Sequence, residues 1–97
     1  MAEVKLIKSE QGLLKVRGEI THDSVDALVD AELSSENPVL QIDFSEVTRS
    51  DSSGLALMLH WMRNAKKQQF QLQFSNIPEN LMALAKMCNL DDVLPLV

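Results

Sequence analysis

A short polar turn holds the residues of this chain that are best placed to do chemistry. Asp51, Ser52 and Ser53 stand directly before an apolar run that begins with Gly54 and Leu55. The first backbone N–H groups of a helix have no partner inside the helix, so they favour a side-chain oxygen or an anion such as a phosphate. In one interpretation Asp51 or Ser52 caps the helix and Gly54 lets backbones pack closely. In the other, Ser52 is phosphorylated or contacts a partner, because a helix start tolerates added negative charge.

The charges around this turn do not decide between the two interpretations. Asp51 would repel a phosphate on Ser52 unless Arg49 or a metal ion compensated for it. Asp43, Glu46 and Asp51 could in principle hold a hard cation, but their spacing matches no known metal-binding loop. We therefore expect solvated carboxylates, and we predict neither a metal nor another cofactor.

Catalytic machinery is hard to assemble from these residues. A nucleophilic serine needs a base within reach, and the two histidines are His22, near an earlier helix start, and His60, two helical turns after Ser52. At 1.5 Å per residue, His60 lies about 12 Å along the helix axis from Ser52. There is no P-loop and no GxGxxG, HExxH or GxSxG pattern. We expect no enzymatic activity, and we expect Cys88 to be a buried core thiol.

Apolar residues on the helix that follows Ser52 suggest a surface for protein contact. On a helical projection Leu57 falls inside the polar arc, and Trp61 lies at the border between that arc and the core face. Ser53, Ala56 and His60 lie on the same side as Leu57. Together they could form a small mixed surface with Trp61 as its anchor, although a single exposed leucine can also arise by chance. The residues predicted to bind a partner are Asp51, Ser52, Ser53, Leu57, His60 and Trp61.

The elements that must position these residues alternate between strands and helices. A polar turn at 10–12 predicts a β-hairpin, and the later alternation of strand and helix implies crossovers and parallel strands. The expected elements are strands at 4–9 and 13–20, a short amphipathic helix at 22–33 with Thr21 and Asp23 as capping candidates, a strand at 39–44 followed by an acidic turn, a helix at 52–68, a strand at 70–74 and a helix from Pro78. On the helix at 52–68, the residues predicted to face the core are Leu55, Met58, Leu59, Met62 and Ala65. The predicted fold class is α/β, one small mixed sheet covered by helices.

Length and composition place the chain among ordinary globular domains. Its 97 residues predict one domain over 1–97, with 45% hydrophobic and 24% charged side chains. A net charge of −5 disfavours nucleic acid as a partner, since binding to phosphates needs clustered Lys and Arg. A single cysteine cannot form an internal disulfide, and neither a leader nor a spanning apolar segment is evident, so we expect a cytoplasmic protein without membrane insertion.

Over nearly its whole length the chain resembles the STAS domain family, which includes anti-sigma-factor antagonists and the cytoplasmic tails of sulfate transporters. The most specific parts are GEI at 18–20, DSSGL at 51–55 and the late segment LAKMCNLDDVLPL. The resemblance implies a small mixed sheet with helices against it. Within the family, SGLALMLHWMRNAKKQ paired with LAKMCNLDDVLPL most resembles the small cytoplasmic subunits of Gram-negative ABC phospholipid transporters.

This resemblance implies a non-enzymatic accessory subunit that docks on an ABC transporter ATPase at the inner membrane and helps to maintain outer-membrane lipid asymmetry. In those subunits the position of Ser52 usually carries a threonine that contributes to the ATPase contact. The alternative is an anti-sigma-factor antagonist, in which a kinase phosphorylates the serine at that position. DSSG is closer to the second pattern, whereas Thr21 stands where many family members have an aspartate near the phosphoacceptor.

Overall fold

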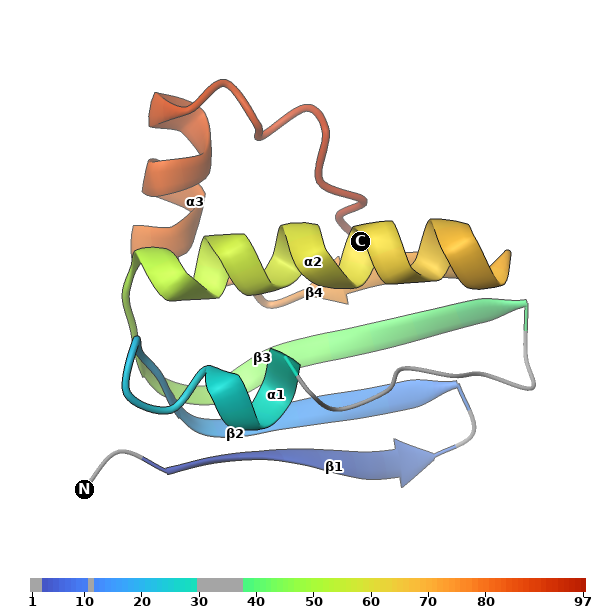
Figure 1. Cartoon of the computed structure of the whole chain (residues 1–97), viewed down its shortest axis with the longest axis horizontal. Helices are drawn as coiled ribbons and strands as arrows, with labels where there is room; N and C mark the ends of the chain where they lie inside the picture. The colour runs from blue at the N-terminus through green and yellow to red at the C-terminus, as the bar shows by residue number, and fades with distance from the viewer. Residues whose placement is uncertain (1–2, 11, 30–37) are drawn as a thin grey trace.

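A mixed four-stranded sheet forms the framework of the protein (Figure 1). The computed structural model describes residues 3–10, 12–29 and 38–97. The strands lie in the order β1-β2-β3-β4, which is also their order in the chain. They are β1 (Val4–Glu10), β2 (Leu13–Ile20), β3 (Val39–Ser50) and β4 (Gln71–Ser75), and the helices are α1 (Asp26–Val29), α2 (Ser52–Gln68) and α3 (Glu79–Met87). The predicted fold class is confirmed.

The predicted N-terminal hairpin is confirmed. β1 and β2 pair antiparallel from Val4 opposite Gly18 to Glu10 opposite Leu13. Gly18 has a φ of +106°, and a Cβ there would collide with the carbonyl oxygen of Glu3. A glycine is therefore required where the Glu3 carbonyl lies against β2.

β3 is twice as long as the sequence suggested. The acidic turn expected after Phe44 is instead strand, because β3 remains paired in parallel with β2 as far as Ser50, which lies opposite Ile20. The register shifts between Lys15 and Arg17, which gives β3 an extra residue at its polar segment. Such a bulge bends the strand locally, and the pairing of β3 with β2 continues beyond it. On its other side β3 pairs in parallel with β4.

α1 is shorter than predicted in its described part. Residues 22–25 form turns and the helix covers only Asp26–Val29, while residues 30–33 of the predicted helix lie outside the described residues. The reason is local: Thr21 and Ser24 bond to each other and to the backbone, which offers the chain a turn in place of a helical start. Leu28 is the buried residue of α1.

α2 runs along the sheet in front of β4 in Figure 1, and its predicted bounds are confirmed. It contacts α1, α3 and β4. Its buried residues are Gly54, Leu55, Leu57, Met58, Trp61 and Ala65. Of the predicted core face, Leu59 and Met62 are only half-buried.

The expected exposure of Leu57 is wrong, and so is the position of Trp61 at a surface border. Leu57 is 1% exposed and Trp61 0% exposed. Trp61 packs edge-on against Phe44, with ring centroids 6.4 Å apart. Because α2 is covered by helices as well as by the sheet, it buries a wider arc than a helix that packs against a sheet alone.

The C-terminal residues close the fold beside β4. The Phe74 N–H donates to the Pro95 carbonyl (2.8 Å) and the Val97 N–H donates to the Phe74 carbonyl (2.9 Å). Leu94 is buried, so this irregular tail contributes to the core. Cys88 is exposed, contrary to prediction, because α3 ends at Met87 and Cys88 falls just beyond it. No helix among the described residues is both long and apolar enough to cross a membrane.

Candidate functional site

Ser52 is the first residue of α2 and lies exposed. Within the described part of the chain, its hydroxyl makes no hydrogen bond. β3 ends at Ser50 and leads through Asp51 directly into α2, so the backbone of Ser52 is held by the strand before it and by the helix that it begins. The side chain is therefore available to an incoming group, while the backbone that carries it is fixed at both ends.

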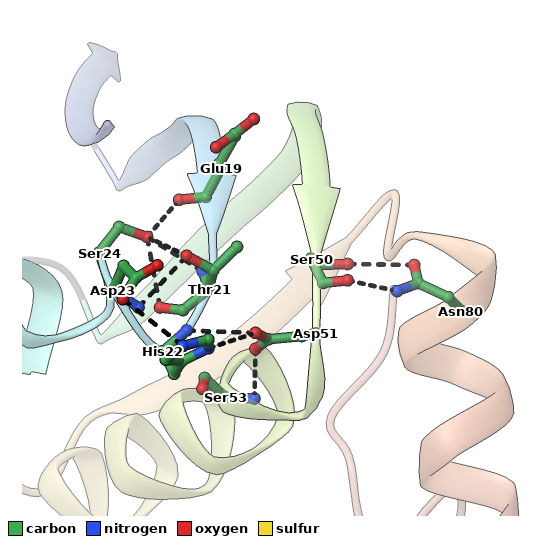
Figure 2. Close-up of polar contacts among 9 residues, drawn as sticks. All are labelled: Glu19, Thr21, His22, Asp23, Ser24, Ser50, Asp51, Ser53 and Asn80. Atoms are coloured by element: carbon green, nitrogen blue, oxygen red, sulfur yellow. Dashed lines mark hydrogen bonds and ion pairs between the residues drawn. The ribbon is translucent and has the colours of Figure 1, made fainter. Parts of the chain in front are cut away.

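Asp51 is the N-cap of α2, which confirms one of the two capping candidates. Its backbone is extended, and its Oδ1 accepts from the Ser53 N–H at 2.8 Å (Figure 2). Its Oδ2 accepts from the His22 N–H at 3.2 Å and lies 3.4 Å from His22 Nδ1. One carboxylate thus fastens the β2–α1 loop to the helix start.

The same hydrogen bonds set the charge state of Asp51. Burial raises its pKa, but the bonds from Ser53 and His22 outweigh that effect and leave the pKa below its ordinary value. The carboxylate is consequently ionised at neutral pH, and it places a negative charge beside Ser52.

The β2–α1 loop is held by its own hydroxyl network (Figure 2). Ser24 Oγ donates to the Glu19 carbonyl at 2.6 Å and accepts from the Thr21 N–H at 3.0 Å. Thr21 Oγ1 accepts from the Asp23 N–H at 3.3 Å. Thr21 and Ser24 are both buried. These contacts place the His22 backbone against Asp51, a junction that the sequence could not reveal because the two loops are far apart in the chain.

A second brace joins the end of β3 to α3. Asn80 Nδ2 donates to the Ser50 carbonyl at 2.8 Å, and Ser50 Oγ donates to Asn80 Oδ1 at 3.0 Å (Figure 2). Next to it, Gly54 packs against α3, where an added Cβ would lie 3.0 Å from both Leu81 methyl groups. Gly54 therefore lets the Leu81 side chain approach the backbone of α2, whereas the expected close approach was between two backbones.

Asp43 also serves the framework. It is buried and accepts from Asn76 Nδ2 at 2.8 Å and from the Ser45 N–H and Oγ at 3.0 and 2.9 Å. Burial raises the pKa of Asp43, but these hydrogen bonds together lower it by more than burial raises it, so the pKa lies below its ordinary value. Glu46 pairs instead with Arg17 at 3.0 Å. Within the described residues no group of three His, Cys, Asp or Glu side chains is arranged to hold a metal ion.

A polar pocket of about 510 Å³ opens beside the helix start. It is lined by Glu19, Thr21, His22, Asp23, Arg49, Ser50 and Asp51. Three carboxylates face one guanidinium there, so the pocket carries a net negative charge that disfavours a phosphate on the neighbouring Ser52.

Of the residues predicted to bind a partner, the structure brings four to one surface. Ser52, Ala56 and His60 are exposed and follow one another at intervals of four residues along α2, with Asp51 and Ser53 half-buried at the start. We call Asp51, Ser52, Ser53, Ala56 and His60 the Ser52 face. The buried Leu57 and Trp61 do not belong to it.

Comparison with known proteins identifies relatives over most of the chain. A family model described as "Mlab, STAS domain" matches residues 5–97. Two curated relatives, from Escherichia coli (strain K12) and Shigella flexneri, are each 36% identical over 83 residues, which covers 84% of this chain and 86% of theirs. Both carry the name intermembrane phospholipid transport system binding protein MlaB.

Proposed function

This chain belongs to the STAS domain family of the MlaB type, and we propose that it is a non-enzymatic accessory subunit of an ABC phospholipid transporter. Its partner is the MlaF-like ATPase subunit, and binding supports assembly or activity of the transporter. The proposal places the protein in the cytoplasm, peripherally attached to an inner-membrane complex that maintains outer-membrane lipid asymmetry. The observation that carries it is the similarity to the two MlaB proteins over 84% of the chain.

The Ser52 face is the surface that we propose for the ATPase contact. Ser52 and Ala56 have short side chains, so a partner helix or loop can approach the α2 backbone closely. The unbonded hydroxyl of Ser52 can both donate and accept a hydrogen bond. Asp51 offers a carboxylate that the neighbouring N–H groups keep ionised, which suits a cationic or N–H donor on the partner.

Rigidity of this face supports the same proposal. Asp51 fixes the first turn of α2 to the β2–α1 loop, and Asn80 fixes the end of β3 to α3. A surface that is ordered before binding loses less conformational entropy when the partner arrives. The Ser52 face is thus built on fixed backbone rather than on a loose loop.

The test is the affinity of this protein for the purified ATPase of its cognate transporter. Ser52→Glu adds charge beside Asp51 and should weaken binding about tenfold or more, since a charge buried without a partner is costly. Ser52→Thr keeps the hydroxyl and should bind within about threefold of the unchanged protein. Ser9→Glu makes the same charge change at an exposed position on β1 and should have no effect.

Unchanged ATPase affinity in the Ser52→Glu variant would remove the Ser52 face from the proposal. Failure of the unchanged protein to bind the ATPase would reject the accessory-subunit role itself. A charge at Leu57 is unsuitable for this test, because Leu57 is buried and the variant would report on folding.

A second function is favoured by one feature, the exposed and unbonded hydroxyl of Ser52 at a helix start. In this alternative the protein is an anti-sigma-factor antagonist that a serine kinase switches at Ser52. Intact-mass measurement on protein from native cells should then show a phosphate that Ser52→Ala abolishes. Absence of phosphate under all growth conditions would reject this alternative.

A further inference from the structure

The C-terminal half of α2 is a basic surface on an acidic protein. α2 contains Arg63, Lys66 and Lys67 and no Asp or Glu, so the helix carries +3 in a chain of net charge −5, which leaves −8 for all other residues. All three cationic side chains are exposed. Among the described residues none of them forms an ion pair or a hydrogen bond through its side chain, so their charges are available to a partner.

An apolar pocket lies directly beside this basic surface. It has a volume of about 280 Å³ and is lined by Met62, Ala65, Lys66, Phe70, Leu72 and Pro95. Lys66 is the one charged residue in the lining, and it joins the pocket to the basic surface. The pocket is shallow and open and is smaller than the roughly 300–1,000 Å³ that small-molecule sites usually enclose, so it suits the tip of one apolar side chain.

The helical geometry separates this pocket from the Ser52 face. Lys66 is 14 positions after Ser52, which places it about 21 Å further along the axis of α2. Met62, one turn before Lys66, lines the pocket. Arg63 and Lys67 do not line it and lie exposed to solvent beside it. The basic surface therefore flanks the pocket on one side only.

We propose that this pocket and its basic flank, formed by Met62, Arg63, Lys66, Lys67 and Phe70, bind an acidic peptide segment of a partner protein through one apolar anchor residue. Acidic side chains next to the anchor would meet Arg63, Lys66 and Lys67 on the basic flank, and because that flank lies on one side of the pocket, the charge complementarity would set the orientation of the segment. The inference does not depend on which protein binds the Ser52 face.

An anionic membrane surface fits the same charges less well. Membrane-bound helices insert protruding apolar residues, whereas here the apolar groups next to the lysines line a shallow depression. The large hydrophobic side chains that are exposed in the described residues are Met87, Val93, Leu96 and Val97, and none of them belongs to α2. The pocket thus favours a peptide side chain over a lipid layer.

The experiment is an NMR titration of the ¹⁵N-labelled full chain at low salt with three probes. They are the acetylated and amidated peptide Glu-Glu-Leu-Phe-Glu-Glu, its counterpart with Lys in place of every Glu, and phosphatidylcholine vesicles containing phosphatidylglycerol. We expect saturable shifts of the Met62, Lys66 and Phe70 amides with the acidic peptide only, at a Kd of about 1 mM or tighter.

Charge reversal tests the electrostatic part. Lys66→Glu with Lys67→Glu should weaken binding of the acidic peptide about tenfold and create binding of the lysine peptide. The single charge reversal Lys86→Glu on α3 should alter the Kd of the acidic peptide less than about twofold. No saturable shift with the acidic peptide, equal shifts with both peptides, or binding of vesicles without binding of the acidic peptide would each overturn the proposal.

Discussion

Removal of the Asp51 carboxylate is the sharpest test of how the Ser52 face is held. Asp51→Ala deprives two backbone N–H groups of their acceptor, that of Ser53 at 2.8 Å and that of His22 at 3.2 Å. Loss of an N-cap costs typically about 1 kcal/mol. The second, partly exposed hydrogen bond adds about 0.5–1 kcal/mol, so the free energy of unfolding should fall by about 1.5–2 kcal/mol.

Asp51→Asn separates the cap from the charge. An asparagine caps helices about as well as an aspartate, so its amide oxygen can keep the bond to Ser53. The substitution removes the charge and weakens the bond to His22, and the free energy of unfolding should fall by about 0.5–1 kcal/mol. Asp23→Ala is the matched control, because that carboxylate is 73% exposed and its only ion pair among the described residues is the 3.5 Å contact with His22. It should change stability by less than about 0.5 kcal/mol.

Urea unfolding followed by the fluorescence of Trp61 measures all three variants. Trp61 is the single tryptophan of the chain and is fully buried, so its emission reports on loss of the core. For a domain of this size the alanine variant should also lower Tm by roughly 6–16 °C. An alanine variant as stable as the Asp23 control would refute the view that Asp51 fastens the β2–α1 loop to α2.

Three other perturbations follow from single contacts. Leu57→Ala should lower the free energy of unfolding in urea by about 2–5 kcal/mol, because Leu57 is buried. A loss as small as that for truncating an exposed leucine would contradict its burial. Gly18→Ala should lower the stability measured by thermal unfolding by about 1–3 kcal/mol, since φ is +106° and the added Cβ meets the Glu3 carbonyl. Unchanged stability would argue against a close contact between Gly18 and that carbonyl. The pKa values of Asp43 and Asp51 are lowered from an ordinary 3.8, so the folded state releases their protons more readily than the unfolded state does. The stability they contribute is therefore present above about pH 4 and lost as pH falls through the folded values, and unfolding at a series of pH values should show a shallower acid loss in Asp51→Asn.

The parts of the fold that were predictable from sequence are those set by local pattern. The hairpin, the bounds of α2 and the cap at Asp51 all follow from alternation, periodicity and residue type within a few positions. The burial of Leu57 was not predictable in this way. It depends on neighbouring helices that cover α2, and a projection of one helix contains no information on which flanks are covered.

The length of β3 escaped sequence reasoning for a similar reason. Its second half, from Ser45 to Ser50, is polar and reads as a turn, yet pairing with β2 keeps it extended. The exposure of Cys88 depends on where α3 ends, one residue before it, and helix ends are the least certain part of a pattern. The length of β3 is thus decided by pairing with a strand distant in the chain, whereas the exposure of Cys88 is decided by the local end of α3.

Two of the backbone donors that an anion at the start of α2 would need already have acceptors. The Ser53 N–H already donates to Asp51 Oδ1, and the Gly54 N–H donates to the Asp51 carbonyl at 2.9 Å. The ionised carboxylate also offsets the positive end of the helix dipole, which would otherwise attract a phosphate. An anion at Ser52 would compete with Asp51 for the N–H groups of Ser53 and Gly54, and the negative charge of Asp51 would repel it. The first turn of α2 is thus better suited to a partner that brings hydrogen-bond donors than to one that brings negative charge.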